Sequence, residues 1–448
     1  MRPVENGTQP SLRRVLGVPD GVAVLVGITI GAGIFTTPQI IARYQSSFSE
    51  IIVFWILAGF FVFIGGLIYA ELGTRLPNTG GEYVYLHRAF GPFIGFLFGW
   101  AQLFIIRTSP AAGLSLAAAD YIGHFIPLHG MAHTGVALGI IAFIGVLNYV
   151  GIRQASVFQN LTTIIKVVGL LALVVAGLIQ LTDHPSLLGT RAEPTAELGP
   201  IGNIGALMML VLFSYIGWDR VGYLAGEMKN PRRTIPPTMI YGLAVIFLLY
   251  LSANFIYHAT LGMEGVRASK IVASDVATIL FGPIGAGFVS LLVIISCIGS
   301  INGTSMAAPR VYYAMARDRL FFRWLDYVHP RFRTPSRAVL AHCGWAVVIL
   351  LVRQNFQDIV AGMTFAILIF YVMTTLALFK LRRSGVGETD CFRVPMYPYL
   401  PALYLLLLVA LIGVRGFFEW QNSLKDLAFI ATGLPFALVW ARRHRNQG

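Results

Sequence analysis

The sequence predicts an all-α integral membrane protein with twelve membrane-spanning helices, two of which are interrupted near the middle. Apolar residues make up 56% of the 448 residues and charged residues only 12%, and the mean hydropathy is +0.72. A soluble domain carries about 25% charged residues, so most of this chain cannot face water. Apolar runs of about 20 residues, enough to cross a bilayer as a helix, recur along the chain.

We expect one transmembrane domain over residues 19–441, between polar tails at 1–18 and 442–448. The division between spans is least distinct after residue 337, where Arg353 and Asp358 separate two apolar runs. The twelve predicted spans lie near residues 20–42, 50–72, 90–119, 131–150, 157–181, 201–224, 237–259, 280–313, 337–353, 358–380, 397–415 and 424–441.

The distribution of positive charge predicts the orientation of these spans. Of 33 lysines and arginines, 24 fall in the tails and loops on one side and 7 on the other, while Arg107 and Lys166 fall inside spans. Because cytoplasmic loops carry the excess of positive charge, we place both termini in the cytoplasm, in the cell's inner membrane. The net charge of +13 therefore follows from topology and contact with membrane lipids, and we expect no nucleic-acid partner.

Two glycine-containing strings interrupt the first and sixth spans. Glycine disfavours helix, and unwound backbone at membrane depth is tolerated only inside protein or beside a cavity. The breaks lie five spans apart, so the interrupted helices run in opposite directions. This indicates a five-plus-five inverted repeat, 20–181 and 201–380, followed by two extra spans within 397–441.

Paired breaks of this kind indicate a binding site near the middle of the membrane. Backbone N–H groups and a helix N-terminus suit a carboxylate, and unpaired carbonyls suit an ammonium group, so a zwitterionic amino acid would satisfy both. The alternative is that the glycines only permit close helix packing. The candidate site residues are Thr29, Ile30, Gly31, Ala32, Gly33 and Ile34 in the first break and Phe213, Ser214, Tyr215, Ile216, Gly217 and Trp218 in the second.

Lys166 lies about ten residues into the fifth span, where an ionisable group is functional by default. Its ammonium group could replace a coupling cation between the first break and hydroxyl groups of the eighth span. Ser300, Asn302, Thr304 and Ser305 cluster there. The alternative is a lysine that only tethers helices. Arg107 precedes Pro110, which frees a carbonyl by kinking its helix, and we expect Arg107 to bond that carbonyl; the alternative is that Arg107 contacts the substrate.

The remaining polar residues point to no catalysis. Glu71, Asp120 and Asp219 lie near span ends, where we expect them to be solvated or paired. The three cysteines, at 297, 343 and 391, have neither disulfide nor metal-ligand spacing. We find no nucleophile–base constellation or cofactor motif, and predict no enzyme activity, cofactor or metal site.

Several strings resemble a known family. Residues 29–35 (TIGAGIF) resemble the first-span signature of amino acid–polyamine–organocation transporters, and residues 213–218 resemble that superfamily's sixth-span break. Within it, the chain is similar to the L-type amino acid transporters at residues 69–73 (YAELG), 77–85 (PNTGGEYVY), 106–109 (IRTS), 227–236 (EMKNPRRTIP) and 299–303 (GSING). The matches run from residue 20 to about 335, and Ala32 departs from the usual serine.

The resemblance implies the leucine-transporter-like fold and sodium-independent amino acid transport by alternating access, commonly by exchange. It also implies that Lys166 replaces a sodium site and that Asn302 lies beside the substrate. The loop 121–130 lacks the cysteine that bonds a heavy subunit in animal relatives, so we expect no such partner; the oligomeric state stays open. The sixth break holds no acidic residue, which favours neutral amino acids. Proton-coupled uptake and a membrane receptor on this scaffold remain alternatives.

Overall fold

The computed structural model describes residues 12–31, 33–183, 186–195, 199–353, 363–387, 389–418 and 420–438. Within these ranges the chain forms helices joined by loops, and the only extended pairings there are two isolated bridges, Leu16–Met228 and Ser47–Arg191. The predicted all-helical architecture is confirmed for this part of the chain. The predictions for residues 1–11, Ala32, residues 358–362 and residues 439–448 concern parts of the chain outside the described residues.

The first half of the chain contains both long helices and short helical pieces. In order, these are α1 (Val18–Thr29), α2 (Gly33–Ile41), α3 (Phe48–Arg75), α4 (Glu82–Phe90), α5 (Pro92–Ala101), the π-helical turn η1 (Gln102–Ile106), α6 (Thr108–Ile122), α7 (Met131–Val150) and α8 (Ile152–Asp183).

The second half repeats this mixture. Its elements are α9 (Gly199–Tyr215), the 3-10 helix η2 (Trp218–Glu227), α10 (Pro231–Ala268), α11 (Val272–Phe281), α12 (Ile284–Ala307), α13 (Pro309–Arg317), the 3-10 turn η3 (Arg323–Leu325), α14 (Ser336–Arg353), α16 (Met363–Arg383), α17 (Tyr399–Phe418) and α18 (Trp420–Ala431).

Eight helical stretches of the described chain are long and apolar enough to cross a membrane. They correspond to the predicted second, fourth to eighth, tenth and eleventh spans. The other four predicted spans fall short by length: the first is divided into α1 and α2, the third is interrupted by η1, and α14 and α18 are short. A multi-pass membrane protein is therefore established, whereas the count of twelve stays a prediction.

Several boundaries agree with expectation and two helices were not foreseen. The fourth predicted span coincides with α7 at 131–150. The predicted eighth span began at 280, but residues 280 and 281 end α11, and α12 starts at Ile284. Neither α4 nor α11 was predicted, because each is too short to form an apolar run of membrane length.

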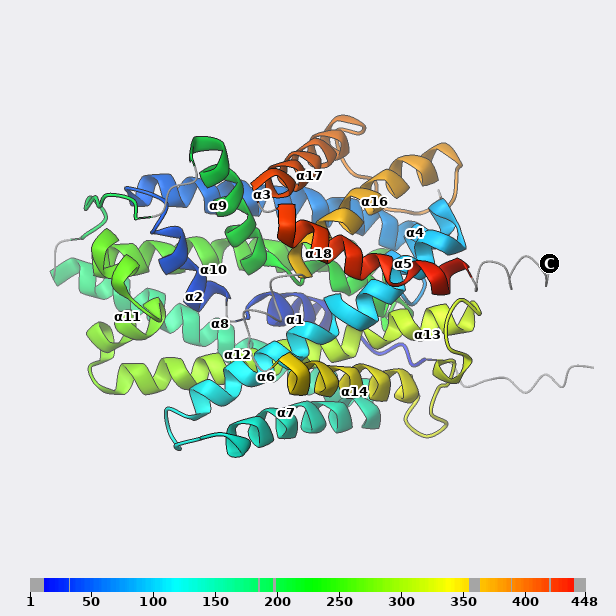
Figure 1. The fold of residues 1–448 in the computed structure, drawn as a ribbon, viewed down its shortest axis with the longest axis horizontal. Coiled ribbons are helices and arrows are strands. Elements are labelled where there is room, and N and C mark those ends of the chain that lie inside the picture. The colour runs from blue at the N-terminus through cyan, green and yellow to red at the C-terminus, as the bar shows by residue number, and fades with distance from the viewer. Residues whose placement is uncertain are drawn as a thin grey trace, which may run out of the picture.

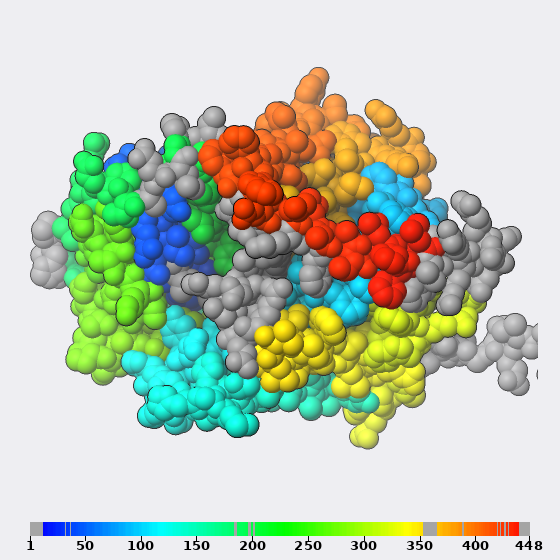
Figure 2. Space-filling view, in the orientation of Figure 1, coloured from blue at the N-terminus to red at the C-terminus, as the bar shows by residue number. Residues whose placement is uncertain are grey.

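The helices pack into one bundle around α1, which contacts α8, α10, α12 and η2. Figure 1 shows α4 and α13 at one end of the bundle, together with the end of the described chain after α18, and α11 at the opposite end. We call the first of these the N-terminal face, because the segment before α1 lies there: Val15 and Leu16 donate to the carbonyl of Glu227 at the end of η2. Figure 2 shows α17 and α18 along the outer surface, where α17 exposes Leu403, Leu406 and Val409.

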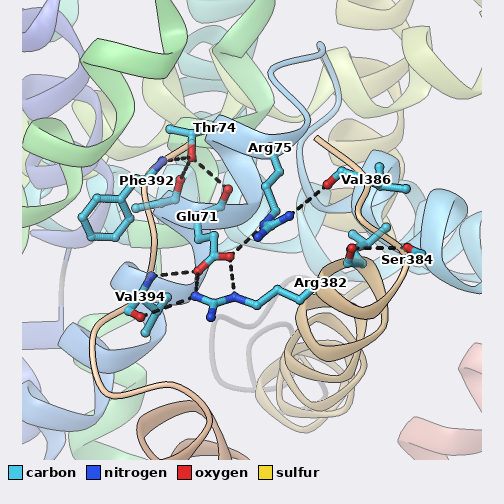
Figure 3. A network of polar contacts seen from close by, with 10 residues as sticks. Glu71, Thr74, Arg75, Arg382, Ser384, Val386, Phe392 and Val394 are labelled. Carbon is cyan, nitrogen blue, oxygen red and sulfur yellow. Dashed lines mark hydrogen bonds and ion pairs between the residues drawn. The ribbon is translucent and has the colours of Figure 1, made fainter. Parts of the chain in front are cut away.

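A buried ionic network fastens α3 to α16 near the N-terminal face (Figure 3). Glu71 accepts from Arg75 Nε at 2.7 Å, from the guanidinium of Arg382 through both carboxylate oxygens, and from the N–H of Val394 at 2.7 Å. Arg75 also donates to the carbonyl of Val386 at 3.0 Å. Glu71 is thus paired, and it connects two spans with the loop that follows α16.

Candidate functional site

The two breaks predicted from glycine lie against each other. The helix α1 ends at Thr29, and α9 ends at Tyr215, with two residues between it and the start of η2 at Trp218. Gly217 adopts φ +133°, and a Cβ there would lie 2.8 Å from Cγ2 of Ile28 and 3.1 Å from the backbone nitrogen of Thr29. Only glycine allows both this conformation and this approach of one break to the other.

A second close approach joins α2, which follows the first break, to α9, which precedes the second. A Cβ on Gly33 would lie 3.0 Å from Cα of Ser214, whose hydroxyl donates to Thr37 at 3.0 Å. A Cβ on Gly31 would meet nothing closer than Ser300 Oγ at 3.7 Å. The alternative of close packing therefore accounts for Gly33 and Gly217 but not for Gly31.

Lys166 reaches the first break from α8. Its Nζ donates to the carbonyl oxygens of Gly27 at 2.6 Å and Ile30 at 3.0 Å and to Oγ of Ser300 at 3.2 Å. The side chain is fully buried, and these three oxygens surround it as oxygen ligands surround a metal cation. The structure places the ammonium group between the break and the eighth span, where we expected it.

Serine hydroxyls of α12 engage the same carbonyls. Ser296 donates to Ile30 at 2.7 Å and lies 3.3 Å from the carbonyl of Gly31, while Ser300 donates to Gly27 at 2.9 Å. We expected unpaired carbonyls at both breaks to hold a substrate ammonium group. For Ile30 that expectation is wrong, because Lys166 and Ser296 already bond its carbonyl.

Tyr250 of α10 joins the ends of both broken helices, and the sequence did not reveal it. Its hydroxyl lies 3.0 Å from the carbonyl oxygen of Thr29 and 2.9 Å from that of Ser214. A phenol has one hydrogen, so it donates fully to only one of the two carbonyls at a time. Tyrosine is common in this chain, with 18 residues, and nothing in its sequence context marks Tyr250.

Asn302 and Thr304 face away from Lys166. The amide of Asn302 donates to the carbonyl of Ala155 at 3.0 Å and to Oε1 of Gln159 at 2.8 Å, and its oxygen accepts from Asn148 at 2.9 Å. Thr304 donates to the carbonyl of Ser300 at 2.9 Å and accepts from Arg220. Of the four polar residues grouped with Lys166, Ser300 is the one that bonds it; substrate contact by Asn302 stays a prediction.

The remaining candidate residues divide by exposure. Gly31, Phe213 and Ile216 are half-buried, whereas Ile30 and Ile34 are buried. Tyr215 packs against Trp55 and Tyr250, and Trp218 packs against Tyr69 and Tyr371 with ring centroids 4.9 and 5.3 Å apart. The hydroxyl of Thr29 is buried and has no hydrogen-bond partner among the described residues. Among the described candidate residues, Gly31, Phe213 and Ile216 are thus only partly covered, and the hydroxyl of Thr29 is unbonded.

Arg107 is bonded differently from our expectation. It donates to Gln102 Oε1 at 2.6 Å, forms an ion pair with Asp219, and donates to the hydroxyl of Tyr223 at 3.0 Å. The expected bond to a carbonyl freed by Pro110 is therefore wrong, because a buried carboxylate directly after the second break pairs with the guanidinium. This pair attaches η2 to the third span.

Glu82, at the start of α4, continues this buried cluster. Its Oε1 accepts from the hydroxyls of Tyr69 and Thr374, both at 2.7 Å, and its Oε2 accepts from Tyr223 at 3.1 Å. The residue is 1% exposed, and none of its hydrogen bonds comes from a cation. Burial, together with the negative charge of Asp219, raises the pKa of Glu82 to about 7.

A family model described as amino acid permease matches residues 16–433 of the chain. The protein belongs to the amino acid permease family. The predicted membership of the amino acid–polyamine–organocation superfamily is thereby confirmed, and the match extends into the last hundred residues, where the sequence strings gave no guidance.

The permease is similar over nearly its whole length to known transporters. It is 35% identical over 395 residues to the serine/threonine exchanger SteT of Bacillus subtilis (strain 168), an alignment that covers 88% of this chain and 89% of that protein. It is 28% identical to the b(0,+)-type amino acid transporter 1 of Homo sapiens, covering 96% and 88%. Identity to the cystine/glutamate transporter of Homo sapiens is 27%, covering 97% and 87%.

Proposed function

We propose that the permease is a sodium-independent exchanger of neutral amino acids that works by alternating access around the two breaks. The observation that carries this proposal is the position of Lys166. Its ammonium group is held by two carbonyls of the first break and by Ser300, and in this proposal it takes the place of a sodium ion between the first and eighth spans. A transporter with a resident cation there has no need of sodium at that position.

The packing supports a five-plus-five repeat within twelve spans. The second predicted span packs on the seventh (α3 on α10), the third on the eighth (α6 on α12) and the fourth on the ninth (α7 on α14). Contacts between span n and span n + 5 are what two interlocked repeats of opposite orientation produce. In this proposal α17 and α18 belong to the two extra spans, and the N-terminal face is cytoplasmic.

In this proposal the site binds the α-carboxylate and α-ammonium groups of the substrate. A carboxylate would bind the first N–H groups of α2, which have no intrahelical partners, and the free hydroxyl of Thr29. The ammonium group would bind carbonyls around the breaks that protein side chains do not occupy. Phe213 and Ile216, half-buried in the second break, would contact an uncharged side chain. The relative named as a serine/threonine exchanger makes L-serine and L-threonine the first substrates to test.

Purified permease in proteoliposomes tests the proposal. We expect labelled L-serine to enter vesicles preloaded with L-serine or L-threonine, at equal rates in sodium and in choline medium, and to enter empty vesicles much more slowly. Accumulation in empty vesicles driven by an imposed pH gradient would instead establish proton-coupled uptake. Binding without flux would establish a receptor. Activity of the single purified chain would also support function without a heavy subunit, and a screen of competing amino acids would define the substrate range.

A further inference from the structure

The buried carboxyl of Glu82 has a hydrogen-bond arrangement that depends on its protonation. Three hydroxyl donors converge on it from three different elements: Tyr69 of α3, Thr374 of α16 and Tyr223 of η2. An ionised carboxylate accepts all three bonds, and bonds to an ionised acceptor are about twice as strong as neutral ones. The ionised form therefore fastens η2, the inner half of the broken sixth helix, to α3 and α16.

The groups around Glu82 do little to neutralise the negative charge of its carboxylate. Among the described residues the cation facing it is Arg107, which acts through the hydroxyl of Tyr223 and is already paired with Asp219. Asp219 faces it with a second negative charge. The titratable and charged groups that face Glu82 from the elements around it are Tyr69 on α3, Tyr85 on α4, Arg107 before α6, Asp219 and Tyr223 on η2, Tyr371 on α16 and Tyr404 on α17.

Proton binding has a definite consequence for Tyr223. Its hydroxyl has one hydrogen and two lone pairs. With Glu82 ionised, the hydroxyl donates to Glu82 and accepts from Arg107. A proton on Oε2 of Glu82 must donate to Tyr223, which then accepts from both neighbours, so its own hydrogen turns to Asp219 Oδ2, 3.5 Å away. Protonation thus reverses one bond, and its effect reaches Asp219, two residues after Gly217.

We propose that Glu82 is a proton-binding gating residue of the transport cycle, which holds the cytoplasmic path closed when ionised and releases it when protonated. The inference rests on the proposed exchange function and on the cytoplasmic position of the N-terminal face. The inference follows from the hydrogen bonds by which Glu82 joins η2 to α3 and α16. Opening toward the cytoplasm must separate η2 from α3 or from α16, and loss of the negative charge of Glu82 weakens all three bonds. The burial of Glu82 raises its pKa to about 7, which places this titration within the physiological range.

Exchange of labelled L-serine at equal internal and external pH tests the proposal. For the wild type we expect the rate to rise at least threefold from pH 8.5 to 5.5, with a midpoint near 7. Glu82→Gln retains an acceptor for Tyr69 and Thr374 and donates to Tyr223, as the protonated acid does, so its rate should be fast and independent of pH. Glu264→Gln, an exposed carboxylate on α10, is the matched control and should keep the wild-type profile.

Two further measurements separate this inference from the proposed function and from misfolding. Infrared difference spectra between the wild type and Glu82→Gln in nanodiscs should show a protonated carboxyl band that disappears as pH rises through 7. Tyr223→Phe removes one donor to the ionised form, so its midpoint should move to higher pH. A wild-type rate independent of pH, the wild-type profile in Glu82→Gln, or an unmoved midpoint in Tyr223→Phe would overturn the gating role while exchange itself stands. Absence of serine and threonine exchange at every pH would overturn both.

Discussion

A single buried residue, Lys166, joins the first break to the eighth span. A lysine in an apolar span is costly, and here its three donors meet the carbonyls of Gly27 and Ile30 and the hydroxyl of Ser300. The same carbonyls are those that unwinding of the first helix sets free. Because a single side chain bonds the break and the eighth span together, a movement of α1 away from α12 must break either its bond to Ser300 or its bonds to Gly27 and Ile30.

We expect Lys166→Met to lower serine exchange by more than tenfold. The substitution keeps an unbranched side chain but removes the ammonium group, so the buried carbonyls of Gly27 and Ile30 each lose one donor, at a cost of about 1.5–3 kcal/mol for each hydrogen bond to a charged group. Exchange in proteoliposomes measures the loss, and serine binding by the purified variant checks that the site persists. Lys270→Met, at an exposed position before α11, is the control. If Lys166→Met exchanges serine at the wild-type rate in both directions, the lysine only holds helices together and has no role in transport.

Lys166 could be recognised from the sequence, whereas Tyr250 and Glu82 could not, and the reason is physical. A charge inside an apolar run is anomalous in any structure, so Lys166 was visible without knowledge of its partners. The role of Tyr250 arises only when Thr29 and Ser214, 185 residues apart in the chain, come within 3.0 Å of its hydroxyl. Glu82 lies in a polar loop of the sequence, and its burial is created by α3, η2 and α16.

At the scale of elements, the interrupted helices are the features that indicate where the candidate site lies. The glycine strings predicted both broken spans, and the structure ends α1 at Thr29 and α9 at Tyr215. The π-helical turn η1 in the third span was not predicted, because Gln102–Ile106 continues an apolar run without glycine or proline. Such turns recur at functional sites, and this one is followed directly by Arg107. Propensity thus reveals breaks made by glycine but not those imposed by packing.

The glycines of the breaks should differ in their tolerance of a methyl group. Gly217→Ala combines a φ of +133° with a Cβ only 2.8 Å from Ile28, and an L-residue in such a conformation costs roughly 1–3 kcal/mol before any clash. We expect it to reduce exchange more than tenfold. Gly31→Ala meets only ordinary contact at 3.7 Å and should retain exchange within about fivefold, allowing for about 1 kcal/mol of altered helix preference.

Rates of serine exchange, normalised to the amount of folded protein, compare the two glycine variants. Gly33→Ala, with contacts of 3.0–3.2 Å to Ser214, should fall between them because the hydroxyl can move and the backbone cannot. If Gly31→Ala and Gly217→Ala lose exchange equally, glycine at position 217 is not required for the close approach of the two breaks.

At the scale of the whole molecule, buried ion pairs hold the bundle together near the N-terminal face. Arg310 forms a bidentate pair with Glu227 at 2.7 and 2.8 Å, and the carbonyl of Glu227 also binds the segment before α1. The network around Glu71 does the same for α3, α16 and the loop at Val394. Charge patterning predicted that positive residues would gather on this side, but not that several of them would be buried as partners of carboxylates.

We expect Glu71→Ala to destabilise the permease by about 3–5 kcal/mol, because removal of one partner leaves two arginines without their buried counter-charge. Thermal unfolding in detergent, followed by tryptophan fluorescence, measures the loss as a lowered midpoint. Glu264→Ala, at an exposed carboxylate on α10, should leave the midpoint within about 1 °C, since surface substitutions change stability by less than about 0.5 kcal/mol. If both variants unfold together with the wild type, the contacts of Glu71 add nothing to the stability of the bundle. If Glu71→Ala alone unfolds early yet exchanges serine at the wild-type rate below its midpoint, this network serves stability and gating is left to Glu82.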